Sequence, residues 1–522
     1  MMKRFMLIAV VFLILTGCKQ NVVVENQNME DVYFTQEKYF PTNEWRKSTP
    51  EAQGMDTEKL MVFFNEVNEK ATGTNSVILT RNGYIVAEKY SEGYTPEIKQ
   101  RIYSATKSIT SALIGIAVDQ GILKLEERVV DIFSEKDIQN LDSDKNQITV
   151  KDLLSMRSGL EYDNSNDSGS DDVMIWEVKD PVSFLLNKPM RVSPDTQYHY
   201  SSGDSFLLTA ILQKKSGMKT VEFADTYLFE PLNIQNREFV ERDNIAVGGN
   251  GLIMTPRDMA KIGFLYLNEG KWDGETLISE QWIEESTKKS SEDRFIYFRG
   301  SHYGYQWVID EIEGHYVYSA QGGYGQYIYV IPDLEIVAVF TSGYDAPETN
   351  NKLKDSVKFI VNAAVSEEAL ASNNEKYNSL ESIKLENRVK DEREKQSMPP
   401  KDIKKIDEQS YVFDSNELGW KELRLSFKGK NEAALKVWLH DGIEEDLSIA
   451  LGDTPLISQT TFGVISVSRQ WKDENTLILY IDHLEYLYNY SIEIRFEDNY
   501  ELIEVKEIWE DVEYNSFEGK KK

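Results

Sequence analysis

The spacing of apolar residues near the start of the chain predicts a helix followed by a hairpin. In MDTEKLMVFFNEVNEK the apolar positions from Leu60 to Val67 fall on one helical face, which is typical of a helix packed on a core. The next segment, SVILTRNGYIVAEKY, has two β-forming runs around Asn82-Gly83. Because this residue pair supplies the positive φ angles of a tight turn, we expect two antiparallel strands.

Two later segments carry the same helical spacing between clear boundary residues. RIYSATKSITSALIGIAVDQGIL becomes apolar after its serine and reaches Gly121, a typical helix end. TPRDMAKIGFLYLNEG has Thr255 as a predicted N-cap and Pro256 at the first helical position, and Gly270 closes it. Both segments are predicted helices, and the first is expected to be buried.

Strand patterns return late in the chain. GQYIYVIPDLEIVAVFTS holds two β-rich runs separated by Pro332-Asp333, and NNKLKDSVKFIVNAAV has the pattern of a final helix. Helices enclosed between early and late strands predict one large α/β sandwich domain, which we assign to residues 51–366.

A charged stretch and a second strand-rich region follow. Residues 367–407 contain Pro399-Pro400 and many charges, a composition typical of a linker. Residues 408–522 repeat short β-forming runs and predict a smaller all-β domain, an antiparallel barrel or sandwich. His440 and His483 stand alone among these strands and are interpreted as structural.

The first residues, MMKRFMLIAVVFLILTGCKQ, combine two cations, an apolar run and small residues, which is typical of an export signal. Leu15-Thr16-Gly17-Cys18 resembles the lipobox of bacterial lipoproteins. The resemblance implies a signal over residues 1–18, lipidation of Cys18, and anchoring on the outer face of a bacterial membrane. An ordinary signal with an incidental cysteine is the alternative, and residues 19–50 are expected to be a polar tether.

Composition narrows the possible partners. The formal charge is −30, from 58 Lys and Arg against 88 Asp and Glu, which argues against a nucleic-acid partner because phosphate binding needs clustered cations. Cys18 is the only cysteine, so disulfides within the chain and cysteine-rich zinc sites are excluded.

Candidate chemistry lies at the start of the first buried helix. Positions three apart share a helical face, so Ser104 and Lys107 can meet. A serine hydroxyl becomes a nucleophile when a base accepts its proton, and a lysine can serve as that base. The same spacing recurs at Ser216-Lys219 and Ser286-Lys289, but only the first pair opens a long apolar helix.

Here the chain resembles the serine β-lactamase and penicillin-binding-protein family, in its class C-like branch. The similar blocks include YSATKSITSALIGIAVDQGILKLEERVVDIF, ITVKDLLSMRSGLEYD, PDTQYHYSSGDSFLLTAILQKKSG and GGNGLIMTPRDMAKIGFLYLNEGKW, in family order. The resemblance implies a three-layer sandwich, an antiparallel sheet with helices on both faces, plus a helical subdomain. It also implies a hydrolase that needs no cofactor and no metal.

The resemblance assigns roles to individual residues. It implies that Ser104 is the nucleophile, Lys107 its lysine partner, and Tyr200 a catalytic tyrosine able to relay protons. The second family motif maps on Tyr200-Ser201-Ser202, where Ser202, predicted to bind substrate, replaces the commoner asparagine. Tyr162-Asp163-Asn164 matches the same pattern and is interpreted as a loop feature.

The third family motif, a cation followed by Thr or Ser and Gly, has no satisfactory match. Lys215-Ser216-Gly217 fits literally but stands only 15 residues after Tyr200, at a predicted helix end. The better positional match is Ala320-Gln321-Gly322-Gly323, in which Ala320 replaces the cation. It predicts substrate contacts from Gln321 and Gly322, and an oxyanion hole from the backbone N–H groups of Ser104 and Gly323.

Two functions remain open from the sequence. The first is a serine hydrolase that cleaves an ester or amide of a small molecule or peptide through an acyl-enzyme on Ser104, with esterase, peptidase and β-lactamase activities all possible. The second is a surface binding or regulatory lipoprotein on a catalytically degenerate scaffold, which Ser202 and the missing cation would favour.

The lipobox generates the first testable prediction. Changing Cys18 to Ser removes the thiol that would accept the lipid, so we expect soluble or unprocessed protein without labelled fatty acid. Metabolic labelling followed by membrane fractionation measures both outcomes. Fatty acid retained on the variant would contradict the assignment of Cys18.

Overall fold

The computed structural model describes residues 39–71, 73–165, 167–291, 301–343, 347–386, 403–429, 432–451, 456–461, 463–509 and 512–522. Cys18 and the predicted signal lie outside these residues. Within the described part of the chain, no helix has both the length and the apolar character to cross a membrane.

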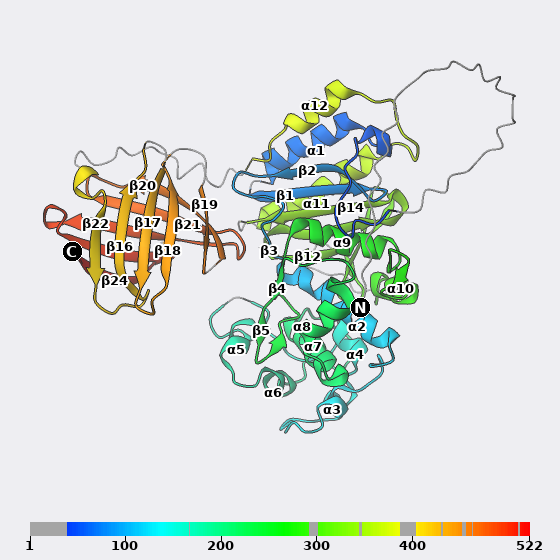
Figure 1. Cartoon of the computed structure of the whole chain (residues 1–522). Helices are drawn as coiled ribbons and strands as arrows, with labels where there is room; N and C mark the ends of the chain where they lie inside the picture. The colour runs from blue at the N-terminus through cyan, green and yellow to red at the C-terminus, as the bar shows by residue number, and fades with distance from the viewer. Residues whose placement is uncertain are drawn as a thin grey trace, which may run out of the picture. The chain divides into compact units, whose positions relative to one another are not determined.

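A seven-stranded antiparallel sheet joins the two ends of the first domain (Figure 1). The strand order is β10-β11-β12-β13-β14-β1-β2, so the last strand, β14, pairs with the first, β1. The bounds are β1 Thr74–Arg81, β2 Tyr84–Tyr90, β10 His302–Tyr303, β11 Val308–Ile312, β12 His315–Gly322, β13 Gln326–Ile331 and β14 Ile336–Ser342. The predicted hairpin is confirmed, with φ of 51° at Asn82 and 81° at Gly83.

Helices cover both faces of this sheet, as the alternation of side chains requires. Val77 and Leu79 of β1 belong to a core with α1 (Thr57–Lys70) and α11 (Pro347–Ala363), whereas Ile78 belongs to the core on the opposite face. On that opposite face lies α9 (Pro256–Leu267). A Cβ at Gly263 of α9 would stand 2.5 Å from Val337 of β14, so glycine permits the close contact between helix and sheet.

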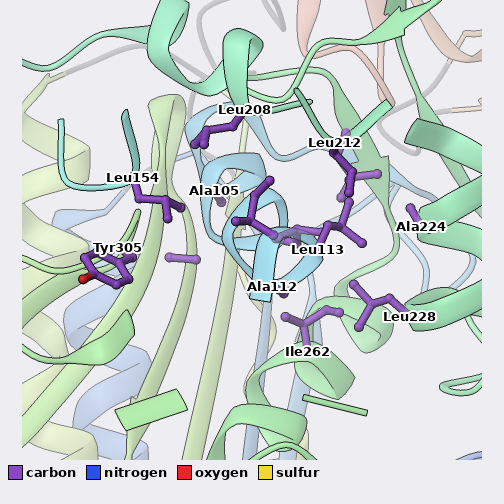
Figure 2. Close-up of a cluster of buried hydrophobic side chains, with 14 of the residues drawn as sticks. Ala105, Ala112, Leu113, Leu154, Leu208, Leu212, Ala224, Leu228, Ile262 and Tyr305 are labelled. Carbon is purple, nitrogen blue, oxygen red and sulfur yellow. The ribbon is translucent and has the colours of Figure 1, made fainter. Parts of the chain in front are cut away.

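A helical subdomain packs around α2 (Thr106–Asp119), whose residues from Thr106 to Ala117 are all buried. Figure 2 shows apolar side chains of this core, among them Leu113, Leu208 and Leu212. The surrounding helices are α3 Val129–Ile132, α4 Val150–Leu154, α5 Asp171–Glu177, α6 Pro181–Leu186, α7 Ser202–Ser216 and α8 Thr220–Ala224. The sheet, the covering helices and this subdomain confirm the predicted three-layer fold.

The last part of the chain forms a separate closed all-β barrel, which confirms the second predicted domain. Its strand order is β18-β17-β16-β15-β24-β23-β22-β21-β20-β19, and a parallel pairing of β18 with β20 closes it. The strands are β15 Gln409–Phe413, β16 Trp420–Phe427, β17 Glu432–Leu439, β18 Glu444–Ala450, β19 Leu456–Thr460, β20 Gly463–Trp471, β21 Thr476–His483, β22 Tyr488–Glu497, β23 Leu502–Trp509 and β24 Val512–Lys521.

Parts of the predicted tether and of the predicted linker pack on the first domain. The end of the predicted tether packs there, because the rings of Phe40 and Trp45 each lie 5.9 Å from the ring of Phe264. Part of the predicted linker forms α12 (Asn374–Ser382), whose Leu380 is fully buried in the core with α1. In both segments a few apolar side chains pack on the core of the first domain. The polar residues around them in the sequence gave no indication of this packing.

Candidate active site

Ser104 lies in a tight turn between a strand and the buried helix. The chain leaves β3 (Gln100–Arg101), forms a 3-10 turn over Tyr103–Ala105, and enters α2. Tyr103 adopts a positive φ of 46°, a conformation that a bulky residue rarely takes without support from its surroundings. Its ring packs on that of Tyr324, with centroids 4.8 Å apart. In this turn Ser104 is half-buried, in contrast to the fully buried residues of α2 that follow it.

Lys107 follows one turn later and is almost completely buried, with 1% of its surface exposed. Its Nζ lies 3.2 Å from Ser104 Oγ, 3.1 Å from Ser202 Oγ and 2.8 Å from the carbonyl oxygen of Gly249. An ammonium group has three hydrogens to donate. The protein therefore offers one acceptor for each hydrogen, and one of these acceptors is the predicted nucleophile.

The carbonyl of Gly249 reaches Lys107 because the loop before β7 (Leu252–Met254) lies close to two helices. Gly248 accepts a hydrogen bond from Thr110 of α2 at 2.9 Å. A Cβ at Gly249 would stand 3.1 Å from Ser202, tighter than ordinary contact. Sequence reasoning did not assign this loop a role, although its run of glycines was a usable signal of close backbone approach.

Tyr200 lies against the same lysine, as its place in the second motif predicts. Its ring centroid is 4.6 Å from Lys107 Nζ, within the range of a cation–π contact. Helix α7 begins directly after it, where the Ser201 hydroxyl caps the helix by accepting from the Asp204 amide at 3.0 Å. The structure thus brings Ser104, Lys107 and Tyr200 together, while the role of Tyr200 as a proton relay stays a prediction.

Ser202 connects the lysine to a residue from another loop. Its hydroxyl donates to Asn164 Oδ1 at 2.7 Å, and its amide donates to the same oxygen at 2.9 Å. Tyr162-Asp163-Asn164 does lie in a loop, as interpreted from the sequence, but Asn164 reaches the site. An amide side chain is therefore present beside Ser202, even though the second motif itself lacks asparagine.

Two carboxyl groups lie near Lys107, that of the buried Asp204 and that of the half-buried Asp172. Burial raises the pKa of Asp204 to about 7, while hydrogen bonds from Ser158 and Ser201 and the charge of Lys107 act in the opposite direction. Burial also raises the pKa of Asp172, which accepts a hydrogen bond from the Tyr162 hydroxyl at 2.8 Å. The low polarity of this region thus favours the neutral form of both acids.

The end of β12 lies against the nucleophile turn. A Cβ at Gly322 would stand 2.1 Å from the carbonyl oxygen of Ile102 and 3.1 Å from the amide of Ala105, so only glycine fits there. At Gly323 the nearest neighbour would be the Tyr103 side chain at 3.9 Å. Ala320, which replaces the family cation, is fully buried, and Gln321 donates to Ser319 Oγ at 2.8 Å. The strand end therefore lies where the third motif was expected.

The other occurrences of the short motifs lie elsewhere and have local partners. Ser216 ends α7, where its hydroxyl accepts from the amide of Met218 at 3.2 Å. Ser286 is buried in α10 (Glu280–Thr287) and donates to the carbonyl oxygen of Ile283. Lys215 pairs with Glu127 at 2.6 Å. No cluster of His, Cys, Asp and Glu able to hold a metal occurs among the described residues.

Comparison with known proteins fits this geometry. A family model described as Beta-lactamase matches residues 62–362, more than half of the 522-residue chain. The chain belongs to the beta-lactamase family. The matched range contains Ser104, Lys107 and Tyr200, and it ends before the barrel.

Relatives of this beta-lactamase family member include hydrolases. The chain is 23% identical over 302 residues to the 6-aminohexanoate-dimer hydrolase of Paenarthrobacter ureafaciens, and the alignment covers 54% of this chain and 75% of that protein. It is 23% identical over 309 residues to a penicillin-binding protein of Bacillus subtilis, covering 51% and 67%. A solved structure of a proposed 6-aminohexanoate-dimer hydrolase from Bacillus anthracis has the same fold, with a TM-score of 0.52, 19% identity, and coverage of 64% and 91%.

The two glycines at the end of β12 give a matched pair of variants. Changing Gly322 to Ala forces a methyl group onto the carbonyl of Ile102, so the strand end must move away from the Ser104 turn. We expect hydrolysis to fall by about 10²–10³-fold, as when an oxyanion donor is lost. Gly323→Ala has room for its methyl group and keeps the backbone N–H, so it should lose much less activity than Gly322→Ala. Equal losses in both variants would contradict the packing argument.

Asp204 gives a prediction about stability and pH. The native carboxyl holds its proton up to about pH 7, whereas an unfolded aspartate releases it near pH 4. Stability from this group is therefore complete at low pH and is lost as the pH rises through 7. Asp204→Asn removes that loss, so the melting temperature of the variant relative to the native protein should rise between about pH 4 and 7. A difference that stays constant over this range would show that Asp204 does not titrate as described.

Proposed function

We propose that the protein is a serine hydrolase that cleaves an ester or amide bond through an acyl-enzyme on Ser104. The observation that carries the proposal is the 3.2 Å contact between Ser104 Oγ and the buried Nζ of Lys107. The hydroxyl of a half-buried serine next to a buried amine is an arrangement suited to nucleophilic catalysis. The assignment of the chain to a family with hydrolase members supports the same conclusion.

The proposed reaction has two stages. Ser104 Oγ attacks the substrate carbonyl while Lys107, after it has released one ammonium proton to solvent, takes the hydroxyl proton, and the backbone N–H groups of Ser104 and Gly323 hold the oxyanion. The C–O or C–N bond then breaks, and the leaving group receives a proton through Lys107 and Tyr200. Water attacks the resulting ester, loses its proton to the same base and releases the acid, which restores Ser104.

The third-motif position favours some substrates over others. Ala320 is buried and carries no charge, so this position cannot attract a substrate carboxylate. We infer that esters or amides without a carboxylate at that place are better substrates than penicillin-like molecules. A hydrolysis screen with p-nitrophenyl esters, a chromogenic cephalosporin and D-amino-acid peptides tests this order, and preferred cleavage of the cephalosporin would overturn it.

The alternative of a degenerate scaffold rested partly on Ser202. The Ser202 hydroxyl donates a hydrogen bond to Asn164 Oδ1 and accepts one from Lys107 Nζ. Ser202 therefore helps to hold the lysine in position. The contact supports the enzymatic function. If the lipobox also operates, the enzyme acts on the outer face of the membrane.

The proposal predicts that Ser104, Lys107 and Tyr200 act as one unit. Ser104→Ala should abolish labelling by a fluorophosphonate probe. Lys107→Met keeps a side chain of similar length and removes the base, so acylation should slow by about 10²–10⁴-fold. Tyr200→Phe retains the ring on Lys107 and loses only the hydroxyl. Combining Lys107→Met with Tyr200→Phe should slow acylation little more than either change alone, because the two residues act in the same proton transfer.

The chain supplies its own controls for this experiment. Ser216→Ala and Ser286→Ala remove serines with the same Ser-x-x-Lys spacing, and both variants should be labelled normally. Circular dichroism checks that each variant is folded. Persistent labelling of Ser104→Ala would overturn the assignment of the nucleophile, and full activity of Tyr200→Phe would remove tyrosine from the mechanism.

A further inference from the structure

The C-terminal barrel encloses a cavity that the proposed hydrolase reaction does not use. The cavity has a volume of about 230 Å³, and most of its wall is apolar, with Leu435, Val437, Leu447 and Ile481 among the lining residues. For scale, an apolar cavity of about 150 Å³ is large enough to hold benzene. Closed barrels of this kind can leave room for a small ligand between their walls.

Two glutamates belong to this otherwise largely apolar wall. Glu445 of β18 and Glu507 of β23 line the cavity, and each has only 8% of its surface exposed. The Glu507 carboxylate accepts from Trp509 Nε1 at 2.7 Å and from Asn515 Nδ2 at 2.5 Å. Among the described residues, neither glutamate forms an ion pair. Two carboxylates are therefore largely removed from water without a protein cation beside them.

Glu445 has an oxygen left for a ligand. Its hydrogen bonds to described residues come from the amide of Thr461, at 3.0 Å, and from the Thr461 hydroxyl, and both end on Oε1. No described residue donates to Oε2. Thr461 thus fixes the carboxylate in place, and the second oxygen can accept a hydrogen bond from a molecule in the cavity.

Aromatic rings line the cavity near these acids. The rings of Tyr490 and Trp509 are stacked, with centroids 5.0 Å apart and an angle of 12° between their planes. The His483 ring also stacks on the Tyr490 ring, with centroids 5.8 Å apart. Aromatic faces attract organic cations as well as apolar groups.

We propose that the barrel binds an organic amine with an apolar body, its ammonium group at Oε2 of Glu445. The apolar wall takes the body of the ligand, which is favourable because apolar surface leaves water. The ammonium group gives the Glu445 carboxylate the positive charge that the described protein residues do not supply, and such a charge-assisted hydrogen bond is stronger than a neutral one. A neutral or anionic ligand would leave this carboxylate uncompensated.

Calorimetric titration of the full chain with octylamine, octanol and octanoate at neutral pH tests the proposal. These probes share one alkyl chain and differ in the charge of the head group. We expect one octylamine to bind per chain at least about tenfold more tightly than octanol, and octanoate not to bind. Octanol binding as tightly as octylamine, or no binding of octylamine, would overturn the proposal.

A matched pair of variants on β18 tests the site itself. Glu445→Gln keeps the oxygen that Thr461 bonds and removes the charge, so octylamine affinity should fall about tenfold or more while octanol affinity is unchanged. Asp446→Asn removes a charge from the next, exposed position of the same strand and should leave both affinities unchanged. The strand signal in circular dichroism should be unchanged in both variants, which shows that the barrel is folded. An equal loss in the two variants would mean that only the general negative charge of the protein attracts the amine.

Discussion

The buried ammonium group of Lys107 is the constraint on which the first domain is organised. A charge without water must be matched by nearby acceptors, or burial becomes very unfavourable. The three acceptors come from separate parts of the chain: Ser104 from the turn before α2, Ser202 from the start of α7, and Gly249 from the loop before β7. Holding the lysine therefore fixes the relative positions of a sheet-proximal turn, the helical subdomain and a glycine loop.

The surroundings of the lysine extend this constraint outward. Asn164 holds Ser202 through two hydrogen bonds, and Thr110 of α2 holds the glycine loop through Gly248. Residues without a direct part in the proposed chemistry thus determine where the base lies. The neighbouring carboxyls also respond to burial, because the pKa of Asp204 and of Asp172 is raised. The proposed site combines one desolvated cation with acids that are more readily neutral than usual.

The barrel shows the opposite balance of charge. In the first domain a buried cation meets oxygen acceptors, whereas the barrel cavity places Glu445 and Glu507 in apolar surroundings without a cation from the described residues. Uncompensated charge in a cavity is a sign of a binding partner, because a stable fold gains little from it. The sites proposed in the two domains therefore differ chemically, one for a carbonyl and one for an amine.

The sequence alone determined the features that depend on neighbours along the chain. Helical spacing placed Ser104 and Lys107 on one face, Asn82-Gly83 specified a hairpin, and alternating residues after residue 408 specified an all-β domain, because each rests on a period of two or of about four residues. Only the tertiary structure revealed Asn164, Gly249 and the need for glycine at position 322, since their partners lie far away in sequence. It also decided that Phe40, Trp45 and Leu380 belong to the first domain, because whether an isolated apolar side chain is buried depends on a surface that the rest of the fold must first create.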